Sequence, residues 1–187
     1  MDENPCYNIN ESDTMNKDEL FINHLPLKTE RLVIRHTILD DVDLLLKMDK
    51  QEETQLYLGG LKDESKEERI AFLDKKINNL ESSMVSLTIL KEKVPIGFID
   101  LNIDEKENTA EISYIFDYDH CNNGYCTEAC QKILDVCFSE LNIESISASV
   151  VSANNSSKRV LERLGFSYER ETIKDSIEFS IYIKHGG

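Results

Sequence analysis

The segment from residue 110 to residue 141 constrains the fold more than any other, because a strand-like and a helix-like pattern meet within it. Residues 110–116 (AEISYIF) predict a β-strand. After a loop that contains Asn122, Asn123 and Gly124, apolar residues recur at helical spacing, which predicts a long amphipathic helix. The expected buried stripe of this helix is Cys130, Ile133, Leu134, Cys137, Phe138 and Leu141. A strand, a small-residue loop and a helix in direct succession indicate a mixed α/β domain.

The flanking sequence supplies further strands and helices. The predicted strands lie at residues 31–36, 85–89, 94–101, 110–116, 146–150, 166–171 and 177–183, the last two as a hairpin. Of four predicted helices, one follows a cap at Asp40 and Asp41, one carries the apolar residues between 70 and 80, one is described above, and a short one ends at Gly165. The strand at 85–89 alternates as in a half-buried strand, and Gly97 is expected to mark a bulge. The order β-α-α-β-β-β-α-β-α-β-β predicts a single α/β (α+β) domain.

Composition excludes several classes of protein. The chain has 187 residues, 40% of them hydrophobic, which suffices for one domain with a substantial core. No stretch approaches the roughly 20 apolar residues that cross a bilayer, and the first ten residues do not resemble a signal peptide, so a cytoplasmic location is expected. The net charge of −15 repels nucleic-acid phosphates and anionic lipid, so neither nucleic acid nor a membrane is an expected partner. The same charge favours a cationic partner such as an amine, but it is equally typical of ordinary solubility.

The cysteines are expected to be free and to bind no metal. Their number is odd, and the sequence lacks an export signal, which disfavours disulfides. The spacing of the last three places them along one stripe of a helix, where cysteine serves as a small buried hydrophobe. No CxxC pair supports zinc. The five residues are Cys6, Cys121, Cys126, Cys130 and Cys137.

The N-terminal segment differs from the rest of the chain. Residues 1–24 are polar and acidic, and we expect a flexible tail. Its end carries Phe21, Ile22 and Leu25, which are candidates for docking on the domain that follows. We therefore place the folded domain at residues 25–187.

The loop at residues 121–126 has features that are typical of an anion-binding site. A helix N-terminus presents unpaired backbone N–H groups, and the helix dipole adds partial positive charge. Gly124 allows a phosphate to approach the backbone closely, and Asn122 and Asn123 tolerate left-handed backbone geometry. Taken alone, the same residues would equally fit a plain turn.

Four motifs in order give the sequence its closest resemblance. They are LKTERLVIR near residue 31, VPIGFIDL at 94–101, AEISYIF…NNGYCTEA at 110–129 and NNSSKRVLERLGF at 154–166. Together they resemble the GNAT acyltransferase superfamily, in the branch of the ribosomal-protein-alanine N-acetyltransferases, over residues 27 to 184. The resemblance implies a GNAT fold: a central mixed, mostly antiparallel sheet of about 6–7 strands, splayed at the middle, with about four flanking helices. It implies transfer of an acetyl group from acetyl-CoA to an amine-bearing acceptor, a small molecule or a protein N-terminus, and it is compatible with a homodimer.

The resemblance also implies where the cofactor binds. The family's pyrophosphate loop, Arg/Gln-x-x-Gly-x-Gly/Ala, falls on residues 121–126, with Cys121 in place of Arg or Gln and Cys126 in place of Gly or Ala. The pantetheine arm of the cofactor would lie between the strands at 111–116 and 145–150. A backbone N–H near Ile115 would polarise the thioester carbonyl. The implied cofactor-binding residues are Ile115, Phe116, Asp117, Cys121, Asn122, Asn123, Gly124, Tyr125, Cys126, Thr127 and Asn154.

Two further residues are implied catalytic groups. Glu111 lies where several relatives carry a catalytic glutamate, and its alternative is a solvated residue or an ion pair. Many relatives protonate the leaving thiolate with a tyrosine on the last helix, but Leu161 stands at that position here. In the resembled branch a serine has this function, and Ser157 is the candidate, the alternative being a role at the helix start. We expect direct transfer in a ternary complex rather than a cysteine nucleophile.

Two alternatives to an enzyme stay open at this stage. The departures at Cys121 and Cys126 and the missing tyrosine are compatible with a non-catalytic acyl-CoA-binding or regulatory module. A phosphate-binding protein of unrelated chemistry could use the same loop for a nucleotide. The acceptor is not readable, although segments 51–66 and 171–176 are expected to select it.

Overall fold

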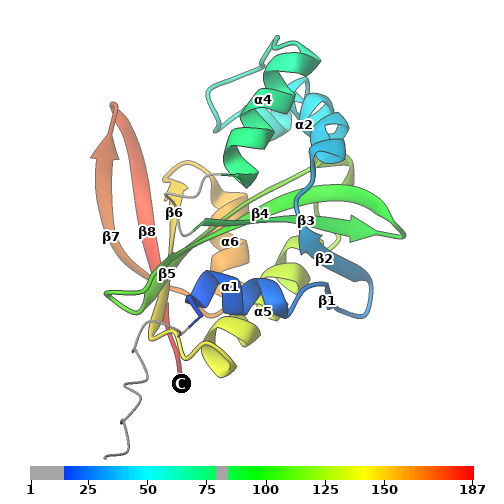
Figure 1. Cartoon of the computed structure of the whole chain (residues 1–187). Coiled ribbons are helices and arrows are strands. Elements are labelled where there is room, and N and C mark those ends of the chain that lie inside the picture. Colours follow the sequence, from blue (N-terminus) through cyan, green and yellow to red (C-terminus); the bar gives the residue numbers. More distant parts are fainter. Residues whose placement is uncertain (1–14, 79–83) are drawn as a thin grey trace, which may run out of the picture.

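A computed structural model describes residues 15–78 and 84–187, and a single mixed sheet organises this part of the chain (Figure 1). Eight strands of the described chain form the sheet in the order β1-β2-β3-β4-β5-β6-β8-β7. Neighbouring strands are antiparallel except β5 and β6, which are parallel. The strands are β1 (Leu27–Lys28), β2 (Leu32–His36), β3 (Met84–Lys91), β4 (Val94–Asp104), β5 (Thr109–Phe116), β6 (Ser145–Val151), β7 (Ser167–Lys174) and β8 (Ile177–His185).

The sheet parts between β5 and β6. Their pairing covers only Thr109 to Glu111 on β5 and Ser145 to Ser147 on β6. Both strands run on beyond these pairs, β5 to Phe116 and β6 to Val151. The expected splayed sheet with flanking helices is therefore confirmed.

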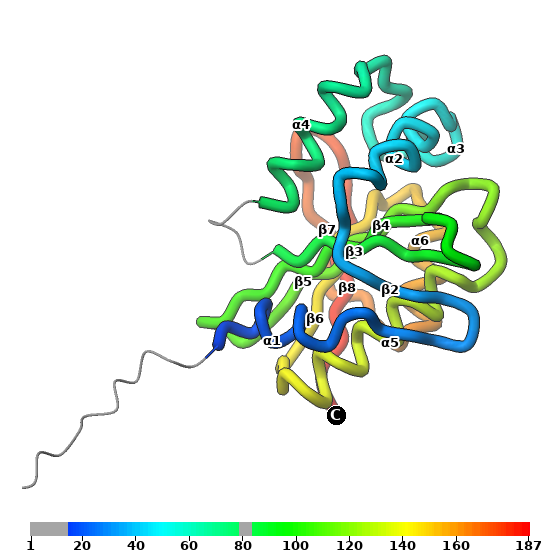
Figure 2. Tube along the Cα trace, turned by 45° about the vertical axis from the view of Figure 1, so that its right-hand side comes forward, coloured from blue at the N-terminus to red at the C-terminus, as the bar shows by residue number. Residues whose placement is uncertain are grey.

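Helices cover both faces of the sheet (Figures 1 and 2). The larger core lies on the face of α1, α5 and α6, where Phe21, Ile133 and Leu161 are buried together. On the other face Leu44 and Met48 of α2 pack against Phe98 of β4. The helices are α1 (Lys17–Asn23), α2 (Val42–Asp49), α3 (Glu52–Gln55), α4 (Lys66–Ile77), α5 (Tyr125–Ser139) and α6 (Asn155–Arg163), with short 3-10 turns η1 (Leu39–Asp41) and η2 (Tyr118–His120).

The predicted elements are present, and the main corrections concern burial and the N-terminus. Strand β3 was expected to be half-buried, but Ser86 and Thr88 on its polar face are also buried. The reason is that Thr88 lies under the turn before α2, where its hydroxyl donates to Asp41 (Oγ1 to Oδ2, 2.7 Å). Strand β1 and helix α3 were not foreseen, because two and four residues are too few to show a periodicity.

The end of the N-terminal segment is folded rather than loose. Residues 1–14 lie outside the described residues, but residues 17–23 form α1, and Phe21 has no exposed surface. Ile22 stays 39% exposed, so of the three docking candidates Phe21 is the one fully inserted into the core. Its burial among the apolar residues of the sheet accounts for the helix despite the acidic sequence.

Gly97 allows β4 and β5 to approach closely. The β3–β4 pairing shifts register next to it, between Ile89 and Leu90, as the expected bulge requires. A Cβ atom on Gly97 would lie 2.7 Å from the Phe116 ring and 2.9 Å from the Ile115 carbonyl oxygen. The absence of a side chain at residue 97 therefore sets the position of the end of β5.

A buried ion pair fixes α4 to α2. The Arg69 guanidinium donates twice to the Asp49 carboxylate, with Nε–Oδ2 and Nη2–Oδ1 distances of 2.5 Å, and both side chains are at most 4% exposed. A pair of this kind is costly to break, because removing one partner leaves a buried charge without compensation.

Replacing Arg69 by methionine should therefore destabilise the protein by about 3–5 kcal/mol, measured as a lower urea midpoint of unfolding. Lys66→Met is the matched control, because Lys66 on the same helix pairs with Asp43 in solvent (2.7 Å, with 51% and 75% of the two side chains exposed). The control should leave the midpoint nearly unchanged. Equal midpoints for the two variants would contradict the importance of the buried pair.

Candidate functional site

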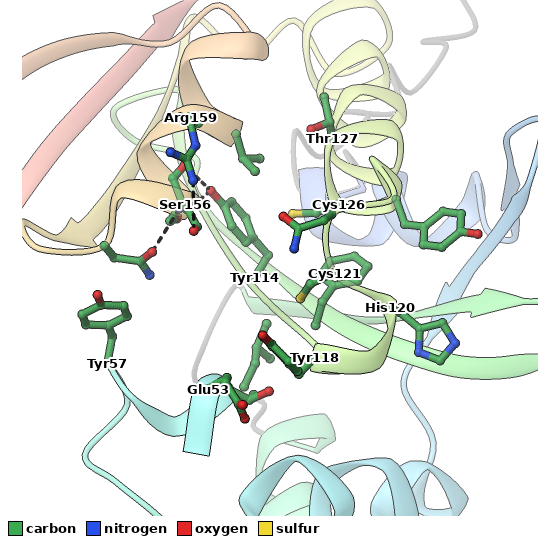
Figure 3. Close-up of a pocket in the computed structure, with 18 of the residues that line it drawn as sticks. Glu53, Tyr57, Tyr114, Tyr118, His120, Cys121, Cys126, Thr127, Ser156 and Arg159 are labelled. Carbon is green, nitrogen blue, oxygen red and sulfur yellow. Dashed lines mark hydrogen bonds between the residues drawn. The ribbon is translucent and has the colours of Figure 1, made fainter. Parts of the chain in front are cut away.

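A cavity of about 540 Å³ opens at the end of β5, beyond the residues at which β5 and β6 stop pairing. The end of β5 lies in its wall, the N-terminal turns of α5 and α6 face it from two sides, and α3 borders it from a third (Figure 3). Ten of the thirteen residues predicted for the site line it, namely Ile115, Phe116, Cys121, Asn122, Gly124, Tyr125, Cys126, Thr127, Asn154 and Ser157.

The loop before α5 has the geometry of an anion site. Gly124 is the N-cap residue, with a left-handed backbone (φ +79°), and Asn122 has φ +60°. In an α-helix the first N–H groups have no partner within the helix, so those of Tyr125 to Thr127 are free to bind a ligand in the cavity. The helix that follows is 15 residues long, and its dipole adds partial positive charge at this end.

Asn123 has a structural role in the same loop. Its side chain does not line the cavity, and its amide nitrogen donates to the carbonyl oxygens of Cys121 (2.9 Å) and His120 (3.3 Å). An asparagine that bonds its own backbone in this way closes a turn. Its expected contact with the cofactor is thus not supplied by the side chain.

Arg31 holds the loop from outside the cavity. Its Nη1 donates to the Asn123 carbonyl oxygen (3.1 Å), its Nε donates to Glu128 Oε2 (2.7 Å), and its guanidinium lies 4.6 Å from the centre of the Tyr125 ring. Burial raises the pKa of the Glu128 carboxyl, but hydrogen bonds from Thr29 and Arg31 outweigh it and leave the pKa below its ordinary value. Arg31 thus brings a cation into contact with a loop that has Cys121 where a basic residue was expected. Its motif was recognised in the sequence, but its partners are 92 and 97 residues away along the chain.

Asp117 fixes the other end of the loop and does not line the cavity. Its carboxylate accepts hydrogen bonds from Lys47 (2.6 Å) and Gln51 (2.7 Å) and contacts the His120 ring nitrogen (3.1 Å). Burial raises the pKa of Asp117, but the hydrogen bonds, foremost the one from Lys47, lower it by more than burial raises it. The pKa of Asp117 therefore lies below its ordinary value. Asp117 was predicted to bind the cofactor, but its side chain does not face the cavity. The carboxylate is instead bound by Lys47 of α2 and by Gln51, which follows α2.

The start of α6 brings hydroxyl and basic groups to the cavity. Asn154 caps the helix by accepting from the Ser157 N–H (3.1 Å). The Ser157 hydroxyl lies 2.8 Å from that of Tyr114, which also lines the cavity. Arg159 and Arg163, one turn apart, extend the lining and were not predicted. Leu161 is 1% exposed and faces the core, so its side chain cannot take the role of a tyrosine there.

Glu111 lies outside the cavity lining. It is exposed on β5 and accepts a hydrogen bond from the Ser149 hydroxyl of β6 (3.1 Å). By strand alternation Glu111 shares a face of β5 with Ile115, and of these two residues only Ile115 lines the cavity. Any contact of Glu111 with a ligand in the cavity therefore requires an intermediary such as water.

The wall formed by α3 and the residues after it has acidic and apolar character. Glu53, Leu56, Tyr57 and Leu58 line it, and the Tyr57 hydroxyl donates to the Ala153 carbonyl oxygen (3.2 Å) at the start of α6. This contact joins two segments that are 96 residues apart in the sequence. Segment 51–66 therefore contributes to the site as expected, whereas residues 171–176 of the closing hairpin do not line the cavity.

The cavity cysteines are poor candidates for a nucleophile. Burial raises the pKa of the Cys121 thiol, and burial with the neighbouring Cys130 raises that of Cys126 well above its ordinary value. Both therefore stay protonated near neutral pH. Within residues 15–78 and 84–187, no group of three or more His, Cys, Asp or Glu side chains is arranged to hold a metal ion. None of the helices described there is long and apolar enough to cross a membrane.

Comparison with known proteins agrees with this geometry. Residues 31–167 match the sequence model of the acetyltransferase (GNAT) domain. The uncharacterized N-acetyltransferase p20 of Bacillus licheniformis is 30% identical over 148 residues, which cover 76% of this chain and 83% of that protein.

Solved structures share the fold. Spermidine N-acetyltransferase of Vibrio cholerae, in complex with CoA and spermine, has a TM-score of 0.72 at 19% identity and covers 84% of this chain and 97% of its own. RimL, a ribosomal L7/L12 alpha-N-protein acetyltransferase in complex with coenzyme A, has a TM-score of 0.73 at 16% identity, with coverages of 86% and 97%. At such identities the likeness concerns the fold alone.

Replacing Arg31 by glutamine should loosen the loop at residues 121–125. The side chain is 43% exposed, so we expect the lost contacts to cost about 1 kcal/mol. Local opening should then become about fivefold more frequent and speed exchange of the Cys121 and Glu128 amides, which are hydrogen-bonded to the Tyr118 and Gly124 carbonyl oxygens. Hydrogen–deuterium exchange measured by mass spectrometry would detect this. Arg170→Gln is the control, because Arg170 pairs only with the adjacent Glu169 among the described contacts. Unchanged exchange of the loop in the Arg31 variant would show that Arg31 does not hold it.

Proposed function

Because this chain belongs to the GNAT acetyltransferase family, we propose that it transfers the acetyl group of acetyl-CoA directly to a primary amine within a ternary complex. The observation that carries the proposal is the cavity at the split between β5 and β6, which faces the N-terminus of α5. A thioester cofactor of extended shape and with phosphates at one end suits both features.

The residues of the cavity fit the anionic part of the cofactor. The N–H groups at the start of α5 would bind the pyrophosphate, and Gly124 leaves the backbone open to it. Arg159 and Arg163 add positive charge on the facing helix, which matters in a chain of net charge −15. The missing basic side chain at Cys121 is thus compensated from α6.

The extended part of the cofactor would lie in the split. Beyond Glu111 and Ser147 the two strands no longer pair, so their backbone groups can bond to an extended ligand as to an additional strand. We assign the polarisation of the thioester carbonyl to a backbone N–H near Ile115. Asn154, which lines the cavity beside Ser157, completes the binding of this arm.

Proton transfers assign roles to Glu111 and Ser157. The attacking amine must be neutral, although a lysine-type amine has a pKa of about 10.4. Glu111 accepts its proton through water, because the carboxylate lies outside the cavity. Ser157 donates a proton to the leaving sulfur, in the place of the tyrosine that Leu161 cannot supply.

The acceptor we propose is a cationic amine, either a small molecule or a protein N-terminus. By their names, one structural neighbour acetylates spermidine, a small polyamine, and the other acetylates the α-amino group of a ribosomal protein. In this chain Glu53 offers a carboxylate on the wall farthest from Arg159, and Tyr57 and Tyr118 flank it (Figure 3). Carboxylate and aromatic groups together attract an ammonium group before it is deprotonated.

A non-catalytic acyl-CoA-binding module is the second candidate. The buried Leu161 favours it, because the usual proton donor of the family is absent from the cavity. Incubation with acetyl-CoA and a panel of diamines, polyamines and short peptides distinguishes the two. The enzyme releases one CoA for each acetylated product detected by mass spectrometry, whereas the module binds acetyl-CoA and gives no product with any amine.

Replacing Glu53 by glutamine should raise KM for a cationic acceptor about fivefold and leave KM for acetyl-CoA unchanged, because Glu53 is exposed and a charge contact in solvent contributes up to about 1 kcal/mol. Glu52→Gln is the matched control, since Glu52 is the neighbouring acid and does not line the cavity. A rise in both variants would point to a general effect of net charge. No rise in the Glu53 variant would remove this residue from the acceptor site.

A further inference from the structure

Two hydroxyl groups from different elements meet in the wall of the cavity. The Oη atom of Tyr114, on β5, lies 2.8 Å from Oγ of Ser157, on α6, and 3.2 Å from the Ser157 carbonyl oxygen. Both residues line the cavity, and Tyr114 lies at its centre, between Ser156 on one side and Cys126 on the other (Figure 3). The contact joins the end of β5 to the start of α6, and both of these border the cavity in which we place the thioester.

The distances favour Tyr114 as the donor, because the phenol has one proton and Ser157 Oγ at 2.8 Å is a nearer acceptor than the Ser157 carbonyl oxygen at 3.2 Å. Burial raises the pKa of Tyr114 far above its ordinary value, with a smaller contribution from Cys126, so the phenol keeps its proton throughout. The backbone N–H of Ser157 is already donated to Asn154, which fixes the position of Ser157 at the helix start. A serine hydroxyl has one proton and two lone pairs. If Ser157 accepts from Tyr114, its own proton is left to point elsewhere.

We propose that Tyr114 is a positioning residue, whose hydroxyl donates to Ser157 Oγ and thereby directs the Ser157 proton at the sulfur of the leaving CoA. This inference rests on the proposed function. Tyr114 would orient the proton donor Ser157 in a chain that has Leu161 where many relatives have a tyrosine as the proton donor. Tyr114 does not itself become charged, because it donates only a hydrogen bond and burial keeps the proton on its oxygen by raising its pKa.

The chemistry balances with Tyr114 unchanged. The nitrogen–carbon bond forms and the carbon–sulfur bond breaks, so the electron pair of the broken bond goes to sulfur. The Ser157 hydroxyl passes its proton to sulfur as it takes one from a water in the same concerted step, so that no serine alkoxide forms. The water is reprotonated in turn by the proton that the amine nitrogen loses, which Glu111 accepts and passes on through water. The net result is an amide and a thiol, with one proton moved from nitrogen to sulfur.

The test is a double-mutant cycle of Tyr114→Phe and Ser157→Ala, in which kcat and KM are measured with an acceptor found in the amine panel. Ser157→Ala should lower kcat about 100-fold, the lower end of what general acid catalysis contributes. Tyr114→Phe should lower kcat about tenfold, with KM for acetyl-CoA and the affinity measured by calorimetry unchanged. In the Ser157→Ala background the tyrosine change should have no further effect, because there is no serine proton left to direct.

Tyr168→Phe is the matched control, since Tyr168 lies exposed on β7 and does not line the cavity. It should keep the kcat of the parent protein. Thermal unfolding of all variants reports any loss of structure, which would lower kcat in both backgrounds alike.

The outcomes separate the two proposals. A tenfold effect of Tyr114→Phe that vanishes in the Ser157→Ala background supports the positioning role. The same fold-loss in both backgrounds, or no loss in either, overturns it while the acetyltransferase activity stands. If the parent protein itself neither binds acetyl-CoA nor acetylates any amine, the proposed function fails, and the role of Tyr114 fails with it.

Discussion

The structure depends on the parting of β5 and β6. Unpaired backbone N–H and C=O groups are costly inside a protein, so a sheet that stops pairing after three residues on each strand requires other partners for them. The close approach of β4 at Gly97 fixes where β5 ends, and the Phe116 ring fills the space that a side chain at residue 97 would take. The split therefore belongs to the packed core and is not a frayed edge. The cavity and the start of α5 and of α6 all meet at this split.

Local charge prevails over net charge at the site. The net charge of the chain is −15, yet the cavity at the split is bordered by the N-terminus of α5 and by the basic side chains of Arg159 and Arg163. Arg31 and Lys47 bind the loop from outside at its two ends through Glu128 and Asp117, and so they neutralise the acids nearest to the anion site. Because fields inside a low-dielectric cleft depend mainly on the nearest groups, this arrangement can accept an anion at one end and a cation beside Glu53 at the other.

Much of the fold could be predicted from the sequence, because the strands and long helices carry clear periodicities. The resemblance of the four motifs implied the family, the split sheet and the role of the loop at Gly124, and the left-handed Gly165 after α6 was expected from its residue type and its place at the helix end. The polarity of Ser86 and Thr88 was misleading, because burial of β3 depends on a distant turn. Side-chain directions were less predictable. Asp117 lies in the right segment but faces Lys47, 70 residues earlier in the chain, and Tyr114 was overlooked because its partner Ser157 is 43 residues away.

The central claim is that the split between β5 and β6, with the loop before α5, binds acetyl-CoA. Isothermal titration calorimetry with acetyl-CoA, repeated in the presence of equal ATP, tests it most directly. We expect one site of micromolar affinity that ATP hardly affects, because much of the binding energy comes from the pantetheine arm in the split rather than from the phosphates alone. Absence of binding, or displacement by ATP at similar concentration, would contradict it.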